Sequence, residues 1–101
     1  MNQKLAGEYS ERYEYMADRY RAITYSKRVE QAMAKEGFPG EVSFMGRPGA
    51  ANALFFPEQE ELGVVFTEGT TLINALTKLI HKLLTESLDE FRRASGEHDA
   101  N

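Results

Sequence analysis

The feature that most restricts the fold is a long stretch near the start of the chain that contains neither glycine nor proline. Residues 8–36 are rich in glutamate, arginine, alanine and methionine, which favour helix. Gly37 and Pro39 follow directly, and a glycine with a proline just beyond it is typical of a helix end. The stretch therefore predicts one long helix, or two helices if the chain breaks near Thr24 and Ser26 caps the second. We favour the single helix.

Apolar residues divide this helix into two faces. Five of them recur every three or four positions and share one side: Tyr9, Tyr13, Met16, Tyr20 and Ile23. A second set points to the opposite side, because a helix turns by about 100° per residue: Tyr25, Val29, Ala32 and Met33. A domain of 101 residues has one modest core, so its small sheet covers only one of these faces. The first set is therefore predicted to contact a partner.

Three short runs with the composition of strands follow the helix. They are residues 41–46, 52–56 and 62–67. Their connections have the turn chemistry of an antiparallel meander, and Pro48 and Gly49 suit the centre of a type II turn. We expect Phe44, Phe56 and Phe66 to point into the core.

Residues 70–93 form the strongest predicted helix, with Thr70 or Thr71 as its N-cap. Leu76, Ile80 and Leu83 are expected at the centre of the core, across from the phenylalanines of the sheet. The element order predicts a single α+β domain over residues 1–94 with a polar tail at 95–101. Its architecture is a long N-terminal helix, a three-stranded antiparallel meander and a C-terminal helix packed on one face of the sheet.

Residues with catalytic or metal-binding chemistry are few. The chain has no cysteine and two histidines, and His81 is the only histidine inside a predicted element. Thr77 and Thr85 lie one turn from His81, but no acidic residue stands where it would orient the imidazole as a general base. The acidic run at residues 58–61 lies in a turn and lacks metal-ligand spacing. We therefore predict a protein that is not an enzyme, with no catalytic residue, cofactor or metal.

Charge and hydropathy argue against nucleic acid and membranes as partners. The formal net charge is −4, and residues 37–69 carry five acids against one cation. The densest basic cluster, within residues 19–28, is interleaved with Asp18 and Glu30, unlike the continuous basic stripe of a phosphate-binding surface. No apolar run reaches the roughly 20 residues of a membrane span or the roughly 7 to 15 of a signal-peptide core. Together with the absence of cysteine, this predicts a cytoplasmic protein.

Tyrosine, arginine and methionine gather on the first helix, and these residue types are enriched in protein interfaces. The predicted partner-binding residues are Tyr9, Tyr13, Met16, Arg19, Tyr20 and Ile23. We expect a non-enzymatic protein-interaction module, a small regulatory or inhibitory factor of the kind that bacteria and their viruses use, such as an antagonist of host defence. It would pair with a second copy as a two-fold dimer, or bind another protein.

Two other functions stay open at this stage. Arg47 lies in a predicted hairpin tip, where its guanidinium group is suited to a carboxylate or phosphate. A small-molecule-binding or sequestering protein for an anionic ligand or nucleotide is therefore one alternative. A nucleic-acid-binding accessory protein is the other.

Overall fold

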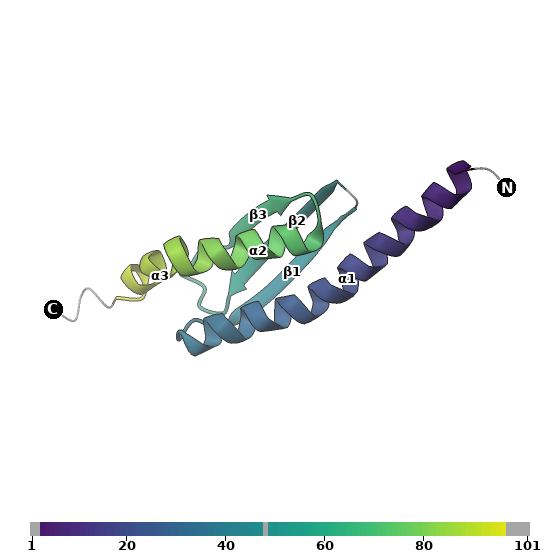
Figure 1. Cartoon of the computed structure of the whole chain (residues 1–101). Coiled ribbons are helices and arrows are strands. Elements are labelled where there is room, and N and C mark those ends of the chain that lie inside the picture. The colour runs from purple at the N-terminus through teal and green to yellow at the C-terminus, as the bar shows by residue number, and fades with distance from the viewer. Residues whose placement is uncertain (1–2, 48, 97–101) are drawn as a thin grey trace.

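The computed structural model describes residues 3–47 and 49–96, with side chains from Tyr15 onward, and shows helices packed on a three-stranded sheet (Figure 1). The elements are α1 (Gln3–Lys35), β1 (Gly40–Arg47), β2 (Ala50–Pro57), β3 (Val65–Gly69), α2 (Leu72–Lys82), the π-helical turn η1 (Leu83–Ser87) and α3 (Leu88–Ala94). The predicted α+β architecture is confirmed. Of the predicted polar tail, residues 95–96 form a turn and residues 97–101 lie outside the described part of the chain.

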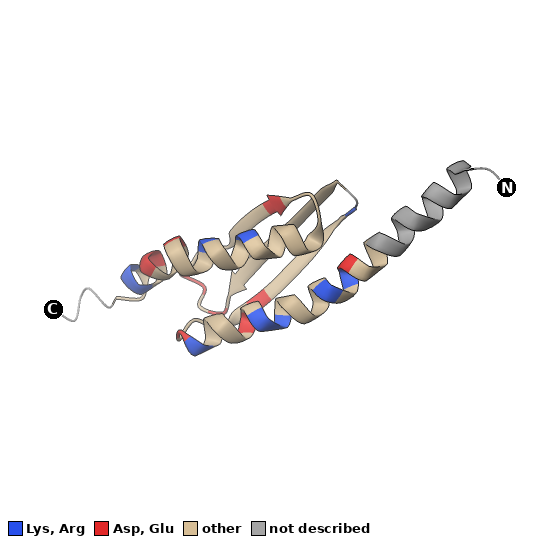
Figure 2. Ribbon diagram, in the orientation of Figure 1, with Lys and Arg blue, Asp and Glu red and all other residues tan. Residues whose placement is uncertain are grey.

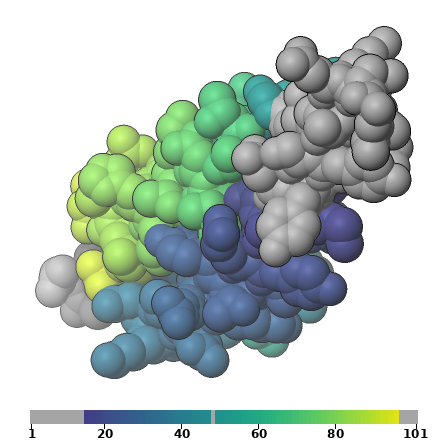
Figure 3. Space-filling model, turned by 45° about the vertical axis from the view of Figure 1, so that its right-hand side comes forward, coloured from purple at the N-terminus to yellow at the C-terminus, as the bar shows by residue number. Residues whose placement is uncertain are grey.

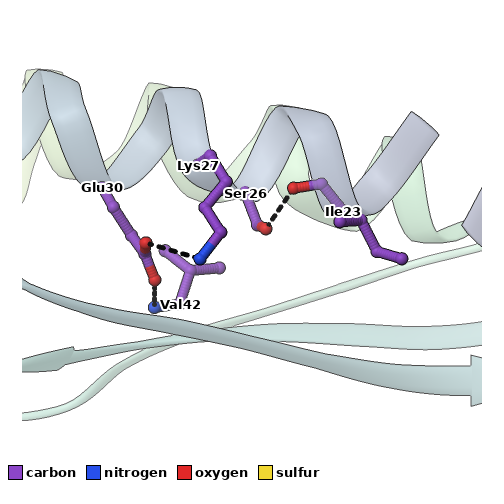
Figure 4. Close-up of polar contacts among 5 residues, drawn as sticks. All are labelled: Ile23, Ser26, Lys27, Glu30 and Val42. Atoms are coloured by element: carbon purple, nitrogen blue, oxygen red, sulfur yellow. Dashed lines mark hydrogen bonds and ion pairs between the residues drawn. The ribbon is translucent and has the colours of Figure 1, made fainter. Parts of the chain in front are cut away.

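α1 is one continuous helix that passes through Thr24 and Ser26. Ser26 does not cap a second helix, because its buried hydroxyl donates a hydrogen bond of 2.8 Å to the carbonyl oxygen of Ile23 within α1 (Figure 4). The predicted stop is confirmed by Gly37, which takes a φ of 94°. A helix of 33 residues is about 50 Å long, whereas strands of 8 residues span about 26 Å. α1 therefore runs well past the end of the sheet (Figure 1).

The sheet is an antiparallel meander in the order β1-β2-β3. Val42 of β1 pairs with Phe55 of β2, and Phe55 pairs with Val65 of β3, so these three side chains share the face toward the helices. Phe55 is fully buried on this face and Val65 is 7% exposed. Pro48 lies outside the described residues, but Gly49 has the φ of 88° that the third position of a type II turn requires.

The predicted facing of two phenylalanines is wrong. Phe56 and Phe66 are 43% and 42% exposed and lie on the side of the sheet away from the helices, while Phe44 is half-buried toward them. The reason is the close approach of α2 to the central strand. β2 contacts α2 on the side that carries its small residues Ala51 and Ala53, which are 4% and 0% exposed. Because side chains alternate along a strand, Phe55 then points inward and Phe56 outward.

The C-terminal helical segment contains a wide turn that the sequence did not predict. Leu76 and Leu83 are fully buried, as expected, and Ile80 is half-buried against the core. Continued α-helical spacing from Leu83 would bring Glu86 and Glu90 onto the buried side. The π-helical turn η1 adds a residue and rotates the following segment. Leu88 and Phe91 are buried there instead, at 6% and 4% exposure.

No helix in the described ranges combines the length and the apolar character that crossing a membrane requires.

Candidate interaction surface

The two faces of α1 have opposite surroundings, as the sequence predicted. Val29 and Met33 are 1% and 0% exposed in the core, whereas Met16, Tyr20 and Ile23 are 56%, 70% and 45% exposed. α1 lies beside the α2 region, and the two helices form neighbouring parts of one surface in the space-filling view (Figure 3). The exposed residues point away from this contact, since they occupy the opposite side of the helix.

Four of the six predicted partner-binding residues come together around one hollow. Met16, Arg19, Tyr20 and Ile23 line a space of about 310 Å³ on the outside of α1. The other two, Tyr9 and Tyr13, lie in α1, but their side chains are outside the described residues. We call Met16, Arg19, Tyr20 and Ile23 the outer α1 surface.

An acidic side chain of α1 caps the N-terminus of α2. The two carboxylate oxygens of Asp18 accept hydrogen bonds from the backbone N–H groups of Leu72 and Ile73, at 2.7 and 3.1 Å. The next N–H group, of Asn74, donates to the hydroxyl oxygen of Thr71 at 2.9 Å. The first N–H groups of a helix lack partners inside the helix, and all three here are satisfied by side chains. Asp18 also places its negative charge at the positive end of the α2 dipole.

Two further side chains of α1 cover the edge of β1. Glu30 accepts a 2.7 Å hydrogen bond from the N–H group of Val42, and its other carboxylate oxygen lies 4.0 Å from the ammonium group of Lys27 (Figure 4). Tyr15 donates a 2.7 Å hydrogen bond from its hydroxyl to the carbonyl oxygen of Gly46. These contacts occupy backbone groups that an uncovered edge strand would offer to another chain.

As a result, the outward side of α1 between Met16 and Lys35 is basic. Asp18 and Glu30 are the only acids between Met16 and Lys35, and both are turned toward backbone N–H groups of the domain. The cations of the same stretch are exposed: Arg19, Arg21, Lys27, Arg28 and Lys35. Figure 2 shows the blue residues of this helix and the red patches on the loop after β2 and on α3. The mixed cluster in the sequence thus separates into an inner acidic and an outer basic side.

A second exposed apolar surface lies on the side of the sheet away from the helices. Met45, Phe56, Val64 and Phe66 are 59%, 43%, 53% and 42% exposed, and Leu54 is half-buried among them. We call these five residues the open sheet face. Sequence reasoning missed it because it assigned Phe56 and Phe66 to the core. The one available signal was the adjacent pair at 55 and 56, of which alternation allows only one to point inward.

The remaining candidate residues are not brought together. His81 is exposed, and the hydroxyls of Thr77 and Thr85 donate to the carbonyl oxygens of Ile73 and His81, at 2.8 and 2.7 Å. Arg47 is exposed at the end of β1 and lines neither the hollow on α1 nor a second one of about 300 Å³ beside α3. Among the side chains that the structure describes, from Tyr15 onward, no group of three or more acids and histidines is placed to hold a metal ion.

Comparison with known proteins found no matching family model, no matching curated protein and no matching solved structure.

Proposed function

We propose that the protein is a non-enzymatic interaction module whose outer α1 surface binds another protein molecule. The observation that carries this proposal is the exposure of Met16, Tyr20 and Ile23 on a helix whose opposite side already forms the core. Large apolar side chains that recur on successive turns and serve no internal packing are typical of helices that dock against a partner.

The chemistry of the surface favours a protein as the partner. Tyrosine, methionine and arginine supply much of the binding energy in protein interfaces, because they bury large areas and retain a polar or charged end. The partner best suited to this surface brings an apolar ridge with acidic neighbours, since Arg19, Arg21 and Lys27 are exposed around it. A second copy of α1, arranged two-fold, has matching heptad-like spacing of the predicted residues but brings the same cations, so the charges favour a different, acidic protein over a second copy.

Nucleic-acid binding is the second candidate function. It is favoured by the outward basic side of α1, where the acids that interleave the cations in sequence are turned inward. The apolar residues at the centre of the surface favour protein over phosphate backbone as its ligand. A binding constant that falls steeply with salt would identify the nucleic-acid function.

The proposal is tested by capture experiments with charge-matched variants. Met16→Glu/Tyr20→Glu places two carboxylates on the outer α1 surface, at a large desolvation cost in any interface there. Gln31→Glu/Ala34→Glu adds the same charge at exposed positions further along α1 and serves as the control. A tagged chain is used to capture an untagged copy and the proteins of its own cells. We expect one captured protein to be retained by the parent and the control, and lost by the Met16/Tyr20 variant.

Equal capture of the cellular proteins by all three chains would remove the outer α1 surface as their binding site. Circular dichroism of each variant shows whether it has kept its fold.

A further inference from the structure

We infer that the open sheet face is a self-association surface on which a second copy of this chain packs in a two-fold arrangement, with Arg47 of each copy meeting Glu68 of the other. This surface is separate from the outer α1 surface, and the inference goes beyond the function proposed above.

Apolar residues occupy much of the outward side of β2 and β3, whereas β1 presents Glu41, Ser43 and Arg47 there beside Met45. An antiparallel sheet covered on one side normally alternates between apolar residues inside and polar residues outside. Here the central strand presents Leu54 and Phe56 outward, and Phe66 lies directly beside Leu54 in β3. Met45 and Val64 extend the apolar area toward opposite corners. A contiguous apolar area of this kind marks an interaction site.

Two of the three charged residues on the outward side of the sheet, Arg47 and Glu68, complement one another under a two-fold rotation, whereas the third, Glu41 in β1, gains no opposite charge from the sheet of the other copy. Arg47 ends β1, and Glu68 lies in β3 beside Asn52, which pairs with Met45. A rotation by 180° about an axis parallel to the strands places β1 of one copy over β3 of the other. Arg47 then stands two residues along the strand from the opposite Glu68, within reach of its long side chain. Among the described side chains, neither Arg47 nor Glu68 has an ion-pair partner within its own chain.

An unpartnered amide lies next to the axis of this arrangement. The Oδ1 atom of Asn52 is buried and has no hydrogen-bond partner within the described chain. Asn52 occupies the central strand on the outward side, so the rotation brings it opposite its own copy. An amide side chain carries both donors and an acceptor, but Oδ1 is covered by its own chain, so two facing asparagines satisfy each other only once their side chains rotate to expose it.

The size of the face predicts a weak and reversible dimer. β1 and β2, each about 26 Å long, and β3, about 17 Å long, are spaced about 4.8 Å apart and present a flat area of roughly 330 Å². Stable interfaces bury about 800 Å² on each partner. The helices lie against the other face of the sheet, so this contact leaves both outer α1 surfaces accessible (Figure 1).

The test is a charge exchange followed by sedimentation over a range from micromolar to millimolar protein. Arg47→Glu and Glu68→Arg each create two like-charged contacts in the dimer, and each is expected to weaken the self-association constant roughly tenfold. Arg47→Glu/Glu68→Arg restores opposite charges and is expected to recover most of the loss. Glu60→Arg is the control, because it makes the same charge reversal as Glu68→Arg but lies in the exposed loop after β2, outside the open sheet face.

Recovery in the double variant excludes misfolding as the cause of the single-variant losses, since a folding defect would add rather than cancel. A parent that stays monomeric at every concentration overturns the inference, as does a double variant no better than the single ones. The outer α1 variant Met16→Glu/Tyr20→Glu keeps the parent's self-association if the inference holds. The capture experiment and the sedimentation experiment can therefore fail independently.

Discussion

Phe55 and Phe56 are neighbours in β2 with opposite surroundings. The ring of Phe55 is fully buried and lies 6.4 Å from that of Phe91, centroid to centroid, whereas Phe56 is 43% exposed on the open sheet face. Their orientation is set by the register of β2, because a slip of one position exchanges the two.

Alanine at each of these positions is expected to have unequal effects on the free energy of unfolding. Phe55→Ala removes a buried ring and should cost about 3 to 5 kcal/mol, whereas Phe56→Ala should cost about 1 kcal/mol or less, as is usual for surface positions. Urea denaturation at low protein concentration measures both without a contribution from self-association. Equal losses would show that the facing of β2 described here is incorrect.

Residue positions set by local geometry were predictable from the sequence. Gly37 and Gly49 take the positive φ that a helix end and a type II turn require, and Val29 and Met33 are buried where helical periodicity places them. The inward choice between Phe55 and Phe56 was not predictable, because it depends on how closely α2 approaches Ala51 and Ala53 from far along the chain.

At the scale of elements, α1 and α2 are joined by the side chain of Asp18, which bonds backbone groups 54 and 55 positions away. The order helix, three strands, helix could be predicted from the sequence, because composition and periodicity are local properties of a few residues. The Asp18 cap and the π-helical turn η1 could not be predicted, since both depend on contacts between segments that are distant in sequence.

Removal of the Asp18 carboxylate is expected to destabilise the packing of α2. Asp18→Ala leaves the N–H groups of Leu72 and Ile73 without this acceptor and should cost about 1 to 3 kcal/mol. Asp18→Asn keeps one acceptor oxygen without the charge and should lose less. Thermal and urea unfolding give the difference, with Glu86→Ala, at an exposed helical acid, as the control. A cost for Asp18→Ala no greater than for the control would contradict the capping role.

At the scale of the whole molecule, the outer α1 surface and the open sheet face lie on different sides of the domain. Periodicity was enough to predict the first surface, because α1 carries apolar residues on two opposite sides and the small sheet covers only one of them. The second depends on the strand register and could not be read from the sequence. A dimer formed through the sheet would carry two outer α1 surfaces, and two linked sites bind a partner with repeated sites more tightly than one.

Self-association through the sheet predicts a melting temperature that depends on protein concentration. A contact made only by the folded chain stabilises it by mass action, so the Tm of the parent should rise as the protein is concentrated. The Tm of Arg47→Glu should change much less over the same range. Scanning calorimetry across that range measures both. Parallel behaviour of the two proteins would remove the open sheet face as the source of the effect.

The continuity of α1 determines how its first turns become helical. A helix in water is costly to begin and inexpensive to extend, so a segment of about a dozen residues seldom forms one alone. The part of α1 that packs against β1 and α2 nucleates the helix. The turns toward Gln3 then extend this helix by one hydrogen bond per residue. The helix–coil equilibrium of the N-terminal turns is thus set in part by residues that lie several turns away, on the side of the helix that faces the core.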